Sequence, residues 1–152
     1  MYNDGQSVTL SVVSHGQENL LKNLIKDIVG MCEPTHDGAG VAKFIITHNI
    51  AENKAACTVD LKSRCHVIIN SAPKGFGSNH NAAFIHCQTE WFAILNPDIR
   101  LCPDVFSRMI SLARHDDILM APALIDPGTG LIAPKRRLPT LWEILMRRLP
   151  CW

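Results

Sequence analysis

The stretch from Lys74 to Asp98 limits the choice of fold more than any other part of the sequence. It opens with a glycine loop, residues 75–77, followed by a segment of helical length that Ser78 would cap. A continuous apolar run, Trp91–Leu95, then has the length of a buried strand and stops at Asn96-Pro97-Asp98. Ligands of open α/β sheets bind just beyond the carboxyl ends of the strands. We therefore expect the glycine loop and Asp98 to face the same crevice.

Strands and helices alternate along the rest of the chain. The expected strands are Ser7–Ser14, Lys43–Thr47, Cys65–Asn70, Trp91–Leu95, Ile118–Leu124 and a short edge strand, Leu131–Lys135. The expected helices are Gln17–Val29, ended by Gly30, a short one after the glycine loop, one from Pro103 to Ala113, and a last one that opens with the capping box at Thr140. Residues 49–63 are ambiguous, and residues 126–130 have the composition of a turn. The alternation predicts an α/β domain of three layers with a mostly parallel central sheet.

The composition is that of a globular protein and not of a disordered or membrane-spanning one. A chain of 152 residues, 47% hydrophobic and 19% charged, is sufficient for one globular domain with a proper core. No apolar run reaches the roughly 18 residues that a membrane span needs, and the first residues do not resemble a signal peptide. These features predict a cytoplasmic protein.

Six cysteines and seven histidines raise the question of a zinc site. The cysteines form no C-x-x-C pair, and the adjacent pairs Cys65-His66 and His86-Cys87 are poorly arranged for tetrahedral ligation from one element. We expect reduced, largely buried cysteines instead.

The net charge of +1 hides a basic C-terminal tail. Residues 133–152 contain five basic residues and one acidic residue, whereas the remainder is mildly acidic. Such a tail fits an anionic surface or ligand, and it fits a solvated helix face at least as well. No aromatic pair typical of RNA-binding domains accompanies it, so the sequence gives little support to nucleic-acid binding.

Right-handed crossovers would bring the loops after the strands to one edge of the sheet. These loops are residues 14–16, 47–49, 70–78 and 96–98. The glycine loop is not a Walker loop, because no Gly-Lys-Ser/Thr follows, and it is not the dinucleotide fingerprint, because it follows the third strand. Taken alone, Asn96-Pro97-Asp98 fits a simple turn equally well.

Five segments in order resemble the family 2 glycosyltransferases of GT-A fold, particularly bacterial rhamnosyltransferase-type members that build surface polysaccharides. They are S-H-G-Q after the first strand, N-S-A-P-K-G-F-G-S-N-H-N-A-A-F, W-F-A-I-L-N-P-D-I-R-L-C-P-D, A-P-A-L-I-D-P-G-T-G and R-R-L-P-T. The resemblance covers about Ser7 to Pro139 and implies a Rossmann-like GT-A domain. It also implies a nucleotide-sugar donor, a saccharide or lipid-linked acceptor and inverting transfer.

The resemblance assigns roles to individual residues. Asn96-Pro97-Asp98 stands where the family carries its D-x-D motif, so Asp98 would bind a divalent cation, Mg²⁺ or Mn²⁺, with Asn96 as a weaker contact. The other implied donor-binding residues are Ser14, His15, Asn49, Gly75, Gly77 and Asn81. The two glycines also fit a tight turn that needs positive φ, and both interpretations can hold together.

Two departures from the family pattern bear on function. Thr47-His48-Asn49 lacks the usual aspartate after the second strand, which leaves the nucleotide open. Family members are generally longer than two hundred residues, and their catalytic base lies beyond the last segment matched here. Asp126 and Glu143, the late carboxylates, do not match that position, so the catalytic residue stays unknown and the chain is expected to be truncated after its donor-binding half.

We therefore expect a nucleotide-sugar-binding domain over residues 1–138 and a basic amphipathic helix over residues 139–152. That helix would contact the inner face of the plasma membrane or, the interpretation we favour, pack against an acceptor-side region. The main functional hypothesis is a glycosyltransferase, and the alternative is a non-catalytic nucleotide-binding remnant or interaction module.

Overall fold

The computed structural model describes residues 7–31, 40–50, 64–114 and 119–133. The chain divides into two compact units, Met1–Met120 and Ala121–Trp152. All the helices and strands named below belong to the first unit. The predicted boundary at residue 138, the last helix and three of the cysteines lie outside the described residues.

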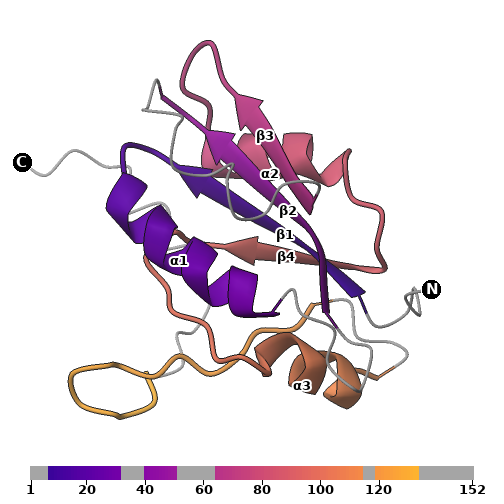
Figure 1. Cartoon of the computed structure of the whole chain (residues 1–152), viewed down its shortest axis with the longest axis vertical. Helices are drawn as coiled ribbons and strands as arrows, with labels where there is room; N and C mark the ends of the chain where they lie inside the picture. Colours follow the sequence, from indigo (N-terminus) through magenta and orange to yellow (C-terminus); the bar gives the residue numbers. More distant parts are fainter. Residues whose placement is uncertain (1–6, 32–39, 51–63, 115–118, 134–152) are drawn as a thin grey trace, which may run out of the picture. The chain divides into compact units, whose positions relative to one another are not determined.

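Four parallel strands form one sheet in the order β3-β2-β1-β4 (Figure 1). Their bounds are β1 Ser7–Ser14, β2 Gly40–His48, β3 Cys65–Ile69 and β4 Trp91–Leu95. β1 and β2 at the centre are almost entirely buried, which is typical of parallel strands covered on both faces and explains their continuous apolar and β-branched runs. This confirms the predicted α/β fold with a parallel sheet and all four of the strands expected before residue 100.

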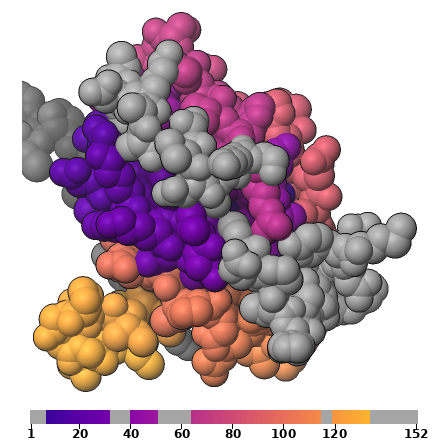
Figure 2. All heavy atoms as spheres, viewed as in Figure 1, coloured from indigo at the N-terminus to yellow at the C-terminus, as the bar shows by residue number. Residues whose placement is uncertain are grey.

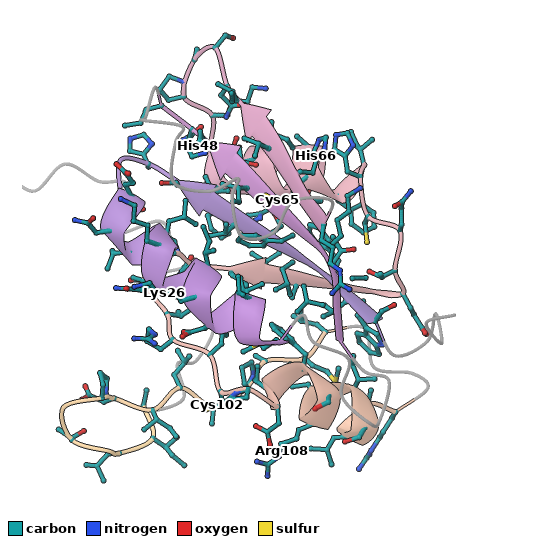
Figure 3. The ribbon with its side chains drawn as sticks, viewed as in Figure 1. Lys26, His48, Cys65, His66, Cys102 and Arg108 are labelled. Carbon is teal, nitrogen blue, oxygen red and sulfur yellow. The ribbon has the colours of Figure 1, made fainter. Side chains whose placement is uncertain are left out.

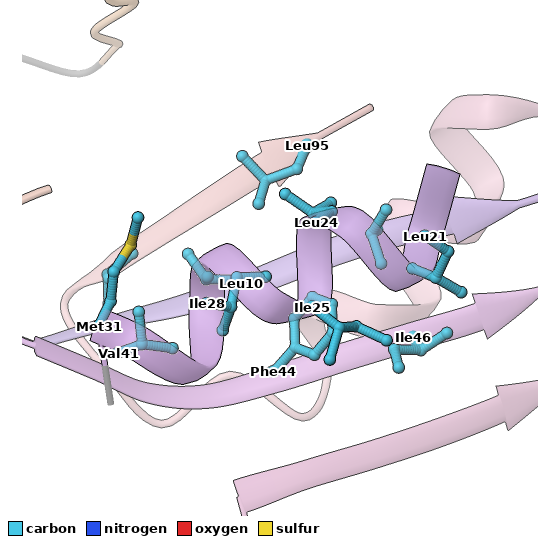
Figure 4. Packing of buried hydrophobic residues seen from close by; sticks show 12 residues of the cluster. Leu10, Leu21, Leu24, Ile25, Ile28, Met31, Val41, Phe44, Ile46 and Leu95 are labelled. Carbon is cyan, nitrogen blue, oxygen red and sulfur yellow. The ribbon is translucent and has the colours of Figure 1, made fainter. Parts of the chain in front are cut away.

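The helix α1, Glu18–Met31, covers one face of the sheet. It is amphipathic, and its inward side packs on alternate residues of β1 and β2 (Figure 4). The buried cluster consists of Val8, Leu10, Val12, Leu21, Leu24, Ile25, Ile28, Met31, Val41, Phe44, Ile46 and Leu95. Burying each large aliphatic side chain of this kind contributes roughly 1.5–3 kcal/mol, so the cluster is the main source of stability for this unit. The helix runs two residues past Val29, so the prediction that Gly30 ends it is wrong.

The helix α2, Phe76–Phe84, covers the opposite face, behind the strands in Figure 1. Successive strand residues point to opposite faces, so Ser11 faces α2 while its neighbours Leu10 and Val12 face α1. The Phe84 ring contacts the Phe92 ring of β4, with centroids 5.1 Å apart and an interplanar angle of 82°. The sheet therefore forms the middle of three layers, as predicted.

The chain after β4 departs further from the sequence prediction. The helix α3 is Val105–Leu112, with Asp104 at its N-cap position, so Pro103 precedes the helix and is not its first residue. Residues 119–124 form no strand, and the described pairing beyond them is a single antiparallel bridge between Ile125 and Ile132. Pro122 lacks an amide hydrogen, which weakens any ladder through this segment. The expected strands from Ile118 and from Leu131 are therefore wrong over their described residues.

The turn between these residues is as predicted. The Asp126 carboxylate accepts hydrogen bonds from the amides of Gly128 and Thr129 at 2.8 and 3.0 Å. None of the helices in the described part of the chain has the length and apolar character needed to span a bilayer.

Candidate functional site

A pocket of about 400 Å³ lies at the carboxyl ends of the strands. It is lined by Val13, His15, Gln17, Asn49, Phe76, Asn79, Asn96, Pro97 and Asp98. These residues come from segments that follow all four strands, because parallel strands end at the same edge of the sheet. The expectation that the four loops share one edge is confirmed.

Four predicted site residues line this pocket: His15, Asn49, Asn96 and Asp98. The other four are not among its lining residues. Ser14 is fully buried at the end of β1, and Gly75, Gly77 and Asn81 are exposed on the segment that begins α2. Their roles as donor contacts stay predictions.

The backbone of the glycine loop differs from the expected tight turn. Gly75 is extended, with φ −66°, and serves as the N-cap of α2, while Gly77 lies within the helix. Neither glycine has positive φ, so that interpretation is wrong, and Ser78 is not the cap because the helix starts two residues before it. Gly16 is the glycine at this edge that needs its conformation, since φ is 83° and an added Cβ would lie 3.3 Å from Ile50 Cδ1.

The side chain of Asn49 holds the loop before α2 in place. Its Oδ1 accepts three hydrogen bonds, from the Lys74 amide at 2.8 Å, Asn70 Nδ2 at 2.8 Å and Asn79 Nδ2 at 3.0 Å. Its Nδ2 donates to the Lys74 carbonyl at 3.0 Å. Asn70 Nδ2 also donates to Asn79 Oδ1 at 2.7 Å, so the three asparagines form a closed amide network around Lys74. A network of this kind, satisfied on all sides, fixes the geometry of the loop.

This network also orients His15. Because three donors fix the position of Asn49 Oδ1, Asn49 Nδ2 is the atom that faces His15 Nδ1, 3.1 Å away. Nδ1 must then accept this hydrogen bond, which assigns the ring hydrogen of a neutral His15 to Nε2. His15 is exposed and lines the pocket, so its ring can present an N–H donor to a ligand. The amide of Asn49 is already occupied by the protein, and its expected contact with a base stays a prediction.

Phe76 at the start of α2 also lines the pocket and is 56% exposed. Its ring contacts the His80 ring in a T-shaped arrangement, with centroids 4.4 Å apart. His80 is buried beneath it, and its Nδ1 lies 2.9 Å from Ser11 Oγ. Burial lowers the pKa of His80, which keeps the ring uncharged near neutral pH. Phe76 is thus a firmly supported apolar surface within an otherwise polar pocket.

The sequence predicted that the glycine loop, residues 75–77, would face this crevice, and Phe76 within it does line the pocket. Asn79 and Gln17 were not predicted as site residues. The available signal was position, because Asn79 lies in the first turn of a helix that starts at the carboxyl edge of the sheet. Asn70, the residue directly after β3, carried the same signal.

Asn96 and Asp98 line the pocket and carry side-chain oxygens that could bind a hard cation. Asp98 is exposed at the tip that follows β4. Mg²⁺ in nucleotide sites is usually bound by one or two carboxylates, with phosphate and water oxygens completing the shell. The side chains present therefore fit a hard cation that is bound together with a nucleotide.

The described residues contain no cluster of three or more His, Cys, Asp or Glu side chains that would hold a metal ion by itself. Figure 3 shows Cys65 and His66 on β3 and Cys102 near the start of α3, well separated in the view. Among the described residues, Cys65, Cys87 and Cys102 form no disulfide bond, and Cys102 is exposed while the other two are partly buried.

Comparison with known proteins identifies the family. The model of glycosyl transferase family 2 matches residues 46–151, which include most of the residues that line the pocket. The chain belongs to glycosyltransferase family 2. No curated protein matches the sequence.

A solved structure supports the fold of this family 2 chain. Residues 1–349 of TarS from S. aureus superpose with a TM-score of 0.56 at 12% sequence identity. The match covers 69% of this chain and 31% of the TarS chain, so this chain spans about a third of the solved chain that it matches. Together with the parallel sheet, this likeness confirms the expected GT-A-like fold.

Proposed function

We propose that this family 2 chain carries the nucleotide-sugar-binding site of a glycosyltransferase. The proposal rests mainly on one observation, that a single pocket joins the Asp98 tip, the start of α2 and the ends of β1 and β2. Such an edge pocket is where open α/β folds bind nucleotides. Family membership supports the same reading.

The residues that line the pocket would bind different parts of the donor. His15 and Gln17 offer polar groups beside the first two strands, and Phe76 offers a face against which a planar or sugar ring can pack. Asp98, with Asn96, would hold a Mg²⁺ or Mn²⁺ ion on the diphosphate. When bound, that ion would neutralise negative charge on the departing nucleoside diphosphate.

The finer function that we propose is inverting transfer of a sugar such as rhamnose. The acceptor would be a saccharide or a lipid-linked saccharide in surface polysaccharide synthesis, and a cytoplasmic location goes with it. Inversion requires a base near the acceptor hydroxyl. Asp126 is a poor candidate, because its hydrogen bonds from the Thr129 and Gly128 amides lower the pKa of its carboxyl group. The catalytic base therefore stays unassigned.

A second candidate is a nucleotide-binding module without transfer activity. It is favoured by the pocket itself, where Asp98 is the one carboxylate among the lining residues that the structure describes. If Asp98 holds the cation, the described lining residues offer no second carboxylate to act as base. Measurement of nucleotide-sugar hydrolysis and transfer separates the two candidates, since the module binds the donor without turnover.

Calorimetric titration tests the binding claim. The chain is titrated with UDP-, dTDP- and GDP-sugars, with and without Mn²⁺. We expect one of these donors to bind in a metal-dependent manner. Asp98→Asn should weaken that binding at least tenfold, and should lower any transfer rate roughly a hundredfold.

Glu90→Gln is the matched control, because Glu90 is an exposed carboxylate at the opposite end of the same strand. It should leave affinity unchanged. The absence of metal-dependent binding of every donor, or equal losses in the two variants, would refute the proposed function.

A further inference from the structure

The Asp27 carboxylate on α1 binds the chain directly after residues 96–98, the segment that we call the Asp98 tip. Asp27 accepts two hydrogen bonds from the Arg100 guanidinium, Nε to Oδ2 at 2.8 Å and a terminal nitrogen to Oδ1 at 2.7 Å. Its Oδ2 also accepts the backbone amide of Leu101 at 3.1 Å. Both carboxylate oxygens are thus used to hold a segment 73 residues away in sequence.

The low solvent exposure of Asp27 strengthens its contacts with Arg100 and Leu101. Its side chain is only 11% exposed, whereas that of Arg100 is 70% exposed. A carboxylate with so little access to water needs partners within the protein. The hydrogen bond with Arg100, followed by that with the Leu101 amide, lowers the pKa of Asp27 and keeps it ionised. A two-pronged guanidinium contact also fixes direction as well as distance.

Residues 99–101, which Asp27 holds, directly follow the pocket residue Asp98. Ile99 and Leu101 pack against the hydrophobic core on either side of Arg100. The tip is therefore tethered at both ends, by β4 before Asn96 and by these contacts after Asp98. Figure 2 shows the surface of α1, in indigo, next to the orange surface of the segment that follows β4.

We propose that Asp27 is a positioning residue that sets the orientation of the Asp98 tip for cation and nucleotide binding. This inference rests on the proposed function, because it assigns Asp27 a role in the same site. Asp27 does not line the pocket and acts through Arg100 and Leu101. Residues that orient a ligand-bearing group typically change metal affinity tenfold or more when removed.

Three variants test the proposal. Asp27→Ala removes all three hydrogen bonds, while Arg100→Lys removes the two-pronged contact at an exposed position and carries little risk to folding. Glu18→Gln is the control, since Glu18 forms an ion pair with Lys22 on the same helix at 2.9 Å and is not among the residues that line the pocket. Mn²⁺ binding is measured by electron paramagnetic resonance with UDP, dTDP and GDP in turn, and backbone amide hydrogen exchange is measured without ligand.

We expect Asp27→Ala to weaken Mn²⁺ binding about tenfold and to accelerate exchange at the amides of residues 98–101. Arg100→Lys should produce a smaller change in the same direction, and Glu18→Gln should change neither. If the wild-type chain binds Mn²⁺ with none of the nucleotides, the proposed function fails and this inference fails with it. If the wild type binds and Asp27→Ala binds equally well, only this inference is overturned, even if exchange is faster.

Discussion

The loop before α2 and the segment after β4, which form two sides of the pocket, are held in place by different kinds of interaction. On the side of the glycine loop, Asn49, Asn70 and Asn79 form a network of neutral amides around Lys74. On the side of the acidic tip, one charged pair and one backbone amide join α1 to residues 100 and 101. Asn49 and Asn79 are almost completely buried, whereas the Arg100 side chain is largely exposed.

This difference has a physical consequence. Neutral hydrogen bonds in a buried network are insensitive to salt, but losing one member such as Asn49 removes several hydrogen bonds at once. A partly exposed ion pair is screened by salt and lost in acid, yet its removal leaves fewer groups unsatisfied. The loop side should therefore contribute more to stability, and the tip side should be the more adjustable wall of the pocket.

Removal of the Asn49 side chain should have the largest effect. Asn49→Ala leaves the Lys74 amide without its acceptor and removes one partner each from Asn70 and Asn79. Asn70 Nδ2 and Asn79 Nδ2 each keep one hydrogen bond, so only the Lys74 amide is left without a partner. An unsatisfied group costs about 1–3 kcal/mol, and with the other lost hydrogen bonds we expect a loss of about 2 kcal/mol in the free energy of unfolding. Urea denaturation measures it, with Asn23→Ala on the exposed side of α1 as control. A loss below about 1 kcal/mol would contradict the importance of the network.

Lowering the pH should reduce stability through His80, on the loop side, and through Asp27, on the tip side, in separate pH ranges. The pKa of His80 is lowered by burial, so below its unfolded value of about 6.5 the unfolded chain binds more protons than the folded chain. Stability should therefore fall as pH decreases from about 7 towards the folded pKa of His80. The pKa of Asp27 is lowered from 3.8, so its contribution is present above that value and is lost as pH falls through the folded pKa.

Denaturation at a series of pH values distinguishes these contributions. His80→Gln should reduce the slope of stability against pH between about 5 and 7, whatever its effect on absolute stability. Asp27→Asn should leave that slope unchanged. Because burial, His86 and Lys43 also lower the pKa of His66, a residual slope of the same sign is expected in His80→Gln. An unaltered slope in His80→Gln would show that His80 is not the group responsible.

Salt should have the smallest effect. Raising NaCl from about 0.05 to 1 M weakens an exposed ion pair, so the melting temperature should fall by only a few degrees more in the wild type than in Arg100→Ala. Asn49→Ala and its parent should respond to salt equally. Thermal melting followed by circular dichroism provides the measurement. If the melting temperatures of the wild type and Asn49→Ala differ more in their salt response than those of the wild type and Arg100→Ala, the loop side is the salt-sensitive one and our comparison of the two sides is wrong.

The sequence predicted the parts of this molecule that depend on local pattern. The runs Ser7–Ser14 and Trp91–Leu95 became β1 and β4 without change, because both are apolar or β-branched and bounded by turn residues. The edge of the sheet that carries the pocket followed from the alternation of strands and helices. The resemblance to family 2 selected His15, Asn49 and Asp98, and all three line the pocket.

The parts that depend on distant contacts were not predictable. The start of α2 at Phe76 is associated with the amide network that holds Lys74, and the distant partner Asn49 cannot be identified from the residues around Ser78. The pairing of Asp27 with Arg100 joins residues that no local pattern relates. The apolar run before Ile125 was expected to form a strand, but strand formation needs a neighbouring strand with free hydrogen-bonding groups, and a single sequence does not reveal one.

The most direct test of the account is to locate bound Mn²⁺ by nuclear magnetic resonance. Mn²⁺ is added with the tightest-binding nucleotide, and the paramagnetic broadening of backbone amides is mapped along the chain. We predict the strongest broadening at the amides of Asn96 and Asp98, with weaker broadening near His15 and at the start of α2, and its loss in Asp98→Asn. Broadening centred elsewhere, or an unchanged pattern in Asp98→Asn, would contradict the assignment of this pocket as the nucleotide-sugar site.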